Sequence, residues 1–143
     1  MIIQELYFML TNRGNGSVLD SEEGGICTNV RSESNSQHWL FEDTGGGYYR
    51  IVQNGSNRVL EGSLKGEVAL REWNGSDNQK WSADNVGDGY CCLVHKATGR
   101  VLDTCIKGKV YCIYWNGANC QQWKLEEAAI YMETISCEVE YNE

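Results

Sequence analysis

The chain has 143 residues, a size typical of one folded domain, and its 12 lysines and arginines against 20 aspartates and glutamates give a net charge of −8. A chain this acidic repels phosphate groups, which argues against nucleic-acid binding and against binding to anionic membranes. Sixteen glycines without a proline, in a sequence that is 41% hydrophobic, exclude a disordered tail and favour an all-β domain with many tight turns.

Short β-rich runs alternate with turn signals along the chain. Residues 1–6 predict a first strand, because Glu5 interrupts the apolar run and no basic segment precedes it, unlike a secretory signal or a membrane span. Residues 48–52 and 90–94 have the β-branched and aromatic composition typical of strands. Turn signals rich in glycine and asparagine lie at 12–16, 45–47, 54–55, 74–75, 87–89, 98–99 and 116–117.

The last twenty residues, after Trp123, are more than a final strand needs. Residues 125–132 predict a short helix, and residues 135–141 alternate apolar and polar side chains as a half-buried strand does. We expect this segment to cover the domain or to form the interface of a homodimer. An extra strand on the same monomer is the alternative.

The cysteines are odd in number, so at least one is unpaired within the chain. They are Cys27, Cys91, Cys92, Cys105, Cys112, Cys120 and Cys137. No two have C-x-x-C spacing, and His38 and His95 have no cysteine or histidine close in sequence, which argues against a zinc site. We expect most of the cysteines to be small buried hydrophobic residues, the adjacent Cys91 and Cys92 to point to opposite faces of a strand, and His38 to face solvent.

Three Asn-x-Ser sequences, at Asn15, Asn54 and Asn74, would accept glycans in a secreted protein. Because no secretory leader is evident, we interpret them as turns of the Asn-Gly type. We expect synthesis in the cytosol, followed by unconventional release where the protein acts outside the cell.

Three landmarks recur three times in register. Gln-x-Trp triplets end at Trp39, Trp81 and Trp123, each 42 residues after the one before. A Val-Leu-acid segment precedes each triplet, and a tyrosine stands eleven residues before each of those valines. The acids are Asp20, Glu61 and Asp103, and the tyrosines are Tyr7, Tyr48 and Tyr90. This register divides a single domain, 1–143, into repeats at about 7–46, 47–88 and 89–126, with a C-terminal extension at 127–143.

A 42-residue unit with this turn spacing predicts four short strands, hence about twelve in all. One unit has too little apolar surface to be stable alone, whereas three arranged around an axis close a barrel and remove its edges. In a strand, residues two apart share a face, so we expect the Gln and Trp of each triplet to point the same way. The Trp would fill the shared core while the Gln amide bonds to backbone beside it.

These three Gln-x-Trp repeats, each preceded by a Val-Leu-acid segment, resemble the ricin-type (R-type) β-trefoil lectins, and the likeness runs from Tyr7 to Glu126. The resemblance implies a pseudo-threefold β-trefoil and a lectin that needs neither metal nor cofactor. It also implies terminal galactose or N-acetylgalactosamine on glycoproteins or glycolipids as the ligand. Individual sites of this kind bind weakly, so the resemblance further implies multivalent, agglutinin-like binding.

In the resembling family, each pocket combines the acid of the Val-Leu-acid segment, an aromatic residue midway along the repeat and an asparagine near the triplet. A carboxylate accepts hydrogen bonds from neighbouring sugar hydroxyls, and the C–H face of the sugar packs on the ring. The usual aromatic position, eight residues before the Gln, holds Asn29, Arg71 and Ile113 here, so neighbouring aromatic residues would have to substitute.

The three repeats differ in how well they supply such a pocket. We rank the third repeat first, with Asp103, Tyr111, Tyr114, Trp115, Asn116, Asn119 and Gln121. The second follows, with Glu61, Trp73, Asn74, Asn78 and Gln79. The first repeat has Asp20 but no aromatic residue between that acid and its triplet, so we interpret it as degenerate.

Other interpretations stay open at this stage. Trp73 and Trp115 could equally be structural plugs under a loop, and Asp20 and Asp103 could cap turns. We expect no enzymatic activity, because one acid per repeat in a threefold fold lies far from the other two. A protein-binding trefoil, such as a protease inhibitor, is the alternative to a lectin, and the targeting module of a toxin or hydrolase is a third candidate.

Overall fold

The computed structural model describes residues 2–106 and 108–133, which form twelve strands and three single-turn 3-10 helices. The strands are β1 (Ile2–Asn12), β2 (Val18–Glu22), β3 (Gly25–Asn29), β4 (Trp39–Gly45), β5 (Tyr48–Gln53), β6 (Val59–Gly62), β7 (Val68–Arg71), β8 (Trp81–Gly87), β9 (Tyr90–His95), β10 (Val101–Asp103), β11 (Tyr111–Ile113) and β12 (Trp123–Glu133). The helices are η1 (Asn35–Gln37), η2 (Asp77–Gln79) and η3 (Asn119–Gln121). The predicted all-β architecture of about twelve short strands is confirmed.

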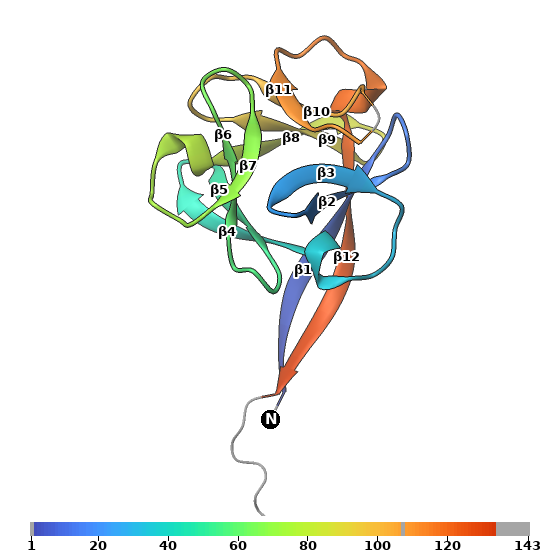
Figure 1. The fold of residues 1–143 in the computed structure, drawn as a ribbon, viewed down its shortest axis with the longest axis vertical. Helices are drawn as coiled ribbons and strands as arrows, with labels where there is room; N and C mark the ends of the chain where they lie inside the picture. The colour runs from blue at the N-terminus through green and yellow to red at the C-terminus, as the bar shows by residue number, and fades with distance from the viewer. Residues whose placement is uncertain (1, 107, 134–143) are drawn as a thin grey trace, which may run out of the picture.

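Six of the strands close into a ring. β1 pairs with β12 and β4, β5 pairs with β4 and β8, and β9 pairs with β8 and β12. The other six form the hairpins β2–β3, β6–β7 and β10–β11, one in each repeat. Figure 1 shows the hairpins grouped around the barrel, with β1 and β12 running on together beyond it as a two-stranded ribbon. This is the pseudo-threefold β-trefoil that the resemblance to ricin-type lectins implies.

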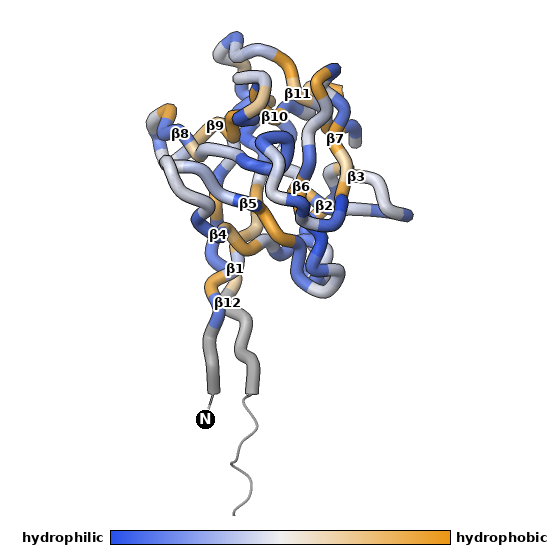
Figure 2. Tube along the Cα trace, turned by 90° about the vertical axis from the view of Figure 1, so that its left-hand side faces the viewer, coloured by the Kyte–Doolittle hydropathy of each residue, from blue (hydrophilic) through white to orange (hydrophobic). Residues whose placement is uncertain are grey.

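The triplet tryptophans form the centre of the core. Trp39, Trp81 and Trp123 are fully buried, and each would expose roughly 150–250 Å² of surface if unfolded. Each indole N–H donates to the backbone carbonyl of the leucine in its own Val-Leu-acid segment, at 2.9–3.1 Å. Those leucines are buried as well, and in Figure 2 the hydrophobic segments follow the strands while the hydrophilic ones lie mostly in the loops.

Two predictions of local structure are wrong. The triplet glutamines end 3-10 helices instead of lying in strands with the tryptophans, because a single turn brings each side chain back beneath the preceding loop. Residues 125–132 belong to strand β12 and not to a helix, because β12 pairs with β1 along all eleven of its residues. The strand predicted at 135–141, and with it the predicted dimer interface, lies outside the described residues.

His38 and the cysteines also differ in part from expectation. The prediction that His38 faces solvent is wrong, since the residue is only 5% exposed. Cys105 and Cys120 form a disulfide, and only Cys92 and Cys112 of the described cysteines are buried thiols, so the expectation that most cysteines are buried is wrong for the described residues. Cys91 and Cys92 are adjacent in β9, where the first is half-buried and the second buried. The described residues contain no helix long and apolar enough to cross a membrane.

Candidate functional site

Each triplet glutamine holds a loop beside the acid of its own repeat. Gln37 donates from Nε2 to the Asp20 carboxylate and to the Val30 carbonyl, both at 3.0 Å, while its Oε1 accepts the Ser32 N–H at 2.8 Å. The same three bonds join Gln79 to Glu61, Glu72 and Asn74, and Gln121 to Asp103, Tyr114 and Asn116. Because these amides are buried and occupied, they position the loops that surround each acid.

A second recurring contact fixes the other end of each loop. Asn12, Gln53 and His95 each pair across the barrel strands with a triplet tryptophan. The side chain of each also hydrogen bonds to a carbonyl just before a triplet glutamine, that of Cys120, Ser36 or Asn78, at 2.9–3.0 Å. Sequence analysis did not identify these three residues. All three are polar and they are spaced by 41 and 42 residues, so aligning the three repeats would have revealed them.

Both carboxylate oxygens of Asp20 accept hydrogen bonds within the protein, and little of the residue reaches the surface. Oδ1 accepts the Ser21 N–H, Oδ2 accepts from Asn29 and Gln37, and the residue is 5% exposed. Burial raises the pKa of Asp20, but the hydrogen bonds that it accepts outweigh burial and leave the pKa below its usual value. The loop above it carries the exposed Val30 in place of an aromatic residue.

Asp103 is more enclosed still, with no exposed surface. Oδ1 accepts the Cys105 N–H at 2.8 Å and Oδ2 accepts from Gln121 at 3.0 Å. Tyr111 stands directly opposite on β11, and burial, followed by the nearby charge of Asp103, raises the pKa of its phenol. Asp103, Cys105 and Cys120 come within metal-binding distance of one another, but the disulfide between the two cysteines leaves no thiolate to bind a metal.

Glu61 differs from both aspartates. Its side chain is 25% exposed, and Oε1 accepts one hydrogen bond, from Gln79 at 2.9 Å. Oε2 lies 3.9 Å from Nε of Arg71, whose side chain is 66% exposed, so that ion pair is long and screened by water. The extra methylene of a glutamate therefore brings a carboxylate oxygen with free acceptor capacity to the surface.

The aromatic residues predicted for the pockets lie in the loops that Gln79 and Gln121 hold by hydrogen bonds, and their side chains are exposed to solvent. Trp73 is 36% exposed, Tyr114 64% and Trp115 45%, so neither tryptophan is buried beneath its loop. The guanidinium of Arg50 lies 5.0 Å from the centre of the Trp73 ring, and that of Arg100 lies 5.2 Å from the centre of the Tyr114 ring. Each guanidinium can occupy only one of the two faces of its ring. Sequence analysis did not single out these arginines.

Two of the asparagines predicted for the pockets use their side-chain oxygen in hydrogen bonds within their own loops. Oδ1 of Asn74 accepts the Ser76 N–H, and Oδ1 of Asn116 accepts the Ala118 N–H, both at 2.9 Å. Asn78 is half-buried, and its carbonyl accepts from His95. Asn119 is exposed at the edge of a cavity of about 590 Å³ that the disulfide also lines.

A second cavity, of about 540 Å³, adjoins Trp73. It is lined by Glu42, Asp43, Thr44, Arg50, Trp73, Gly75 and Lys80. Arg50 binds Glu42 at 2.7 Å in this wall, which leaves charged groups of both signs beside the indole. The Trp73 side chain therefore borders a polar hollow large enough for a saccharide unit.

Three repeated hairpin units around a closed barrel, each with a loop held beside a carboxylate, define a β-trefoil with three loop sites. The model of the family described as "Ricin-type beta-trefoil lectin domain-like" matches residues 3–66 and 35–109. The chain belongs to this family, and membership supports a carbohydrate-binding role. A search of curated proteins finds no match.

Solved structures agree with this assignment of the fold. The chain is 30% identical to ThreeFoil, a designed threefold-symmetric protein, with a TM-score of 0.77 over 84% of this chain and 97% of that one. It is 29% identical to an exo-β-1,3-galactanase from Clostridium thermocellum, with a TM-score of 0.79, over 85% of this chain but only 30% of the enzyme. SeviL bound to asialo-GM1 saccharide is 20% identical, with a TM-score of 0.72 over 86% of this chain and 97% of that one, and shows the shared fold alone.

Proposed function

We propose that this protein is a lectin for terminal galactose or N-acetylgalactosamine, and that the second repeat supplies its principal site. The observation that carries this choice is the half-buried carboxylate of Glu61, whose Oε2 is held only by a long ion pair, together with the exposed ring of Trp73 in the loop that Gln79 holds next to this acid. Gln79 joins the two, because its amide binds both the carboxylate and the loop that carries the indole. Sugar hydroxyls would donate to Glu61 while the C–H face of the sugar packs on Trp73.

This choice changes the order of the pockets that the sequence suggests. The third repeat has more aromatic residues, but its carboxylate is enclosed, whereas that of the second repeat is open. Support for galactose comes from the likeness of the Gln-x-Trp repeats to the ricin-type lectins and from the similarity to part of an exo-β-1,3-galactanase. Tyr114 and Trp115 offer the third repeat a weaker, mainly stacking surface, which would make the lectin multivalent.

The proposed role is binding without catalysis. Each of the three acids bonds to the glutamine of its own repeat, and no two of them meet in one pocket among the described residues. A glycosidase needs two carboxyl groups about 5–10 Å apart across one glycosidic bond. Three separate loop sites suit multivalent attachment to glycans instead.

Calorimetric titration with lactose and with N-acetylgalactosamine tests the proposal. Unmodified protein should bind with a dissociation constant on the order of micromolar to millimolar. Glu61→Gln keeps the shape of the side chain but removes the charged acceptor, so it should weaken binding about tenfold or more. Trp73→Ala should do the same through lost stacking.

Glu72→Gln is the matched control, because it removes one negative charge from an exposed neighbour in the same loop. This control should bind as the unmodified protein does. Full binding by both Glu61→Gln and Trp73→Ala would place the site elsewhere, and the absence of binding to either sugar would refute galactose-type recognition. A fitted stoichiometry above one would support multivalency.

A further inference from the structure

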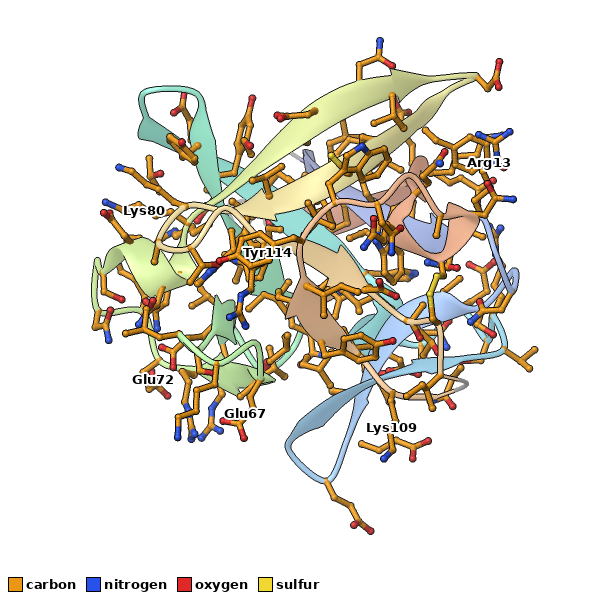
Figure 3. All side chains as sticks on the ribbon, turned by 90° about the horizontal axis from the view of Figure 1, so that it is seen from above. Arg13, Glu67, Glu72, Lys80, Lys109 and Tyr114 are labelled. Carbon is orange, nitrogen blue, oxygen red and sulfur yellow. A yellow bond between two sulfur atoms is a disulfide. The ribbon has the colours of Figure 1, made fainter. Side chains whose placement is uncertain are left out.

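A cavity of about 500 Å³ lies where the hairpins of the second and third repeats meet. Its wall includes Lys65 from the turn between β6 and β7, Arg100 from the segment before β10 and Lys109 from the segment before β11. Glu67 is the one carboxylate that lines it, so three cationic groups face one anionic group on a chain whose net charge is −8. Figure 3 looks onto this face of the molecule, where Glu67, Lys109 and Tyr114 are labelled.

Among the described residues, Arg100 is the one arginine that no carboxylate pairs with. The other five arginines each have a carboxylate within 4.0 Å, whereas no carboxylate of the described residues pairs with Arg100. Its Nε–H is buried and has no hydrogen-bond acceptor. A partly buried guanidinium whose charge no carboxylate balances is costly, and an anion in the adjoining cavity would reduce that cost through the charge of the group.

The guanidinium is also held in place. Gly66, with a φ of +98°, brings its backbone close against Arg100, and a Cβ at this position would lie 2.9 Å from Nη1 and 2.5 Å from the Cys112 carbonyl oxygen. The Gly66 carbonyl accepts the Cys112 N–H at 2.8 Å, which joins the two hairpins behind the arginine. With the Tyr114 ring also against it, the group loses little freedom when an anion binds.

We infer that this cavity is a subsite for the carboxylate or sulfate group of an acidic saccharide. The inference rests on the proposed lectin function and names a class of ligand for it beyond neutral galactosides. Arg100 would bind the anionic group through paired N–H donors, with Lys65 and Lys109 adding charge at the rim. Tyr114 and Ile113 extend from the subsite to the surface and offer apolar contact to the sugar that carries the group.

The overall negative charge of the chain does not oppose such a ligand at short range. At physiological ionic strength, charges more than about 8 Å apart are largely screened, so the local cationic wall determines the binding of a single acidic group. A polyanion would still meet the acidic remainder of the surface. The subsite therefore selects glycans with one acidic residue over sulfated polymers.

Titrations with lactose, 3′-sialyllactose and lactose 3′-sulfate, followed by calorimetry and by the NMR signal of the Arg100 Nε–H, test the inference. At least one acidic sugar should bind about fivefold or more tightly than lactose, shift that signal and lose the advantage at high salt. Arg100→Gln and, separately, the exposed Lys109→Gln should reduce the advantage, and Lys109→Gln should leave lactose binding unchanged. Arg58→Gln removes an equal charge from an arginine paired with Glu72 and should change nothing.

The outcomes separate this inference from the proposed function. If lactose fails to bind but an acidic sugar shifts the Arg100 signal, the galactose site is wrong and the anion subsite stands. A response to the sialylated sugar alone identifies a carboxylate ligand, and a response to the sulfated sugar alone identifies a sulfate. If neither acidic sugar shifts the Arg100 signal, the subsite is refuted, whatever their affinities.

Discussion

The side-chain amides of the triplet glutamines form hydrogen bonds with loop backbone groups, which in the strands are paired by regular secondary structure. The buried amide of Gln37 satisfies a backbone carbonyl, a backbone N–H and a carboxylate that would otherwise lie unpaired within the protein. The loop over each acid does not pair with a neighbouring strand. The glutamine amide therefore makes the hydrogen bonds to the loop backbone that a neighbouring strand would otherwise make. The loop can then vary in sequence, as the change from Val30 to Glu72 and Tyr114 at equivalent positions shows.

Replacing Gln37 with leucine should therefore cost more than its size suggests. Three protein groups lose their partner at once, and we expect the free energy of unfolding to fall by about 2–4 kcal/mol. Urea unfolding followed by tryptophan fluorescence measures this. Ser32→Ala is the control, because it keeps the backbone N–H that Gln37 accepts and should cost less than about 0.5 kcal/mol. A loss no larger than that of the control would show that the loop holds without the amide.

His95 makes stability depend on pH. Its Nε2–H donates to the Asn78 carbonyl while Nδ1 accepts from Thr98, so the folded protein holds the neutral ring. Burial lowers the pKa of His95 below its usual 6.5, and burial lowers the pKa of His38 in the same way. The unfolded chain then binds more protons than the folded chain just below pH 6.5, and stability falls as the pH is lowered through that window.

His95→Gln tests this dependence, because Gln53 makes the corresponding bond in the preceding repeat. Unfolding measured between pH 7.5 and 5.5 should show a smaller loss of stability in the variant, with the remainder due to His38. An unchanged slope would mean that His95 is not the titrating group. The slope is the readout, since lost contact with the Trp81 ring also lowers stability at every pH.

Among the described elements, the segment from β10 to η3 is closed by a disulfide. The disulfide joins Cys105, just after β10, to Cys120 within η3, across fifteen residues. The Cys120 carbonyl also accepts from the Thr104 N–H and from the Asn12 side chain. Together these bonds enclose Asp103 and set the third repeat apart from the second.

Reducing the disulfide should lower the free energy of unfolding by about 3 kcal/mol, the amount expected for a closed loop of fifteen residues. Urea unfolding with and without dithiothreitol measures the change. The double variant Cys105→Ser with Cys120→Ser should match the reduced protein and no longer respond to the reductant. If the oxidised and reduced proteins unfold at the same urea concentration, the disulfide contributes nothing to stability.

The sequence predicts the elements that recur and fails where a partner is distant in sequence. Trp39, Trp81 and Trp123 mark the core and the barrel strands because their motif repeats three times. Residues 125–132 have a helical composition, yet pairing with β1, more than a hundred residues away, overrides that local preference. The enclosure of Asp103 depends on which two of seven cysteines pair, and their number and spacing do not specify this.

At the scale of the whole molecule, the three repeats form a single folding unit. β1 and β12 are the first and last strands of the described residues, and their pairing closes a ring to which every repeat contributes. No repeat has a core of its own, since the three tryptophans pack in a single cluster with the leucines of all three hairpins. We therefore expect unfolding to be a single cooperative transition.

This shared core leads to a quantitative expectation for Trp39→Phe, Trp81→Phe and Trp123→Phe. Each change leaves a buried leucine carbonyl without its N–H donor and a void beside it, at a cost of about 2–4 kcal/mol. Because the three contacts are equivalent, the three costs should agree within about 1 kcal/mol, although the loops above differ in sequence and only one carries a disulfide. Urea unfolding followed by far-ultraviolet circular dichroism measures them without relying on the altered fluorophore.

Trp115→Phe, at an exposed position, should cost less than about 0.5 kcal/mol. If one core variant were nearly neutral while the others were severely destabilised, the threefold geometry would not extend to the energetics. Equal costs would instead show that the barrel determines stability, which leaves the loops free to differ in the ligands they bind.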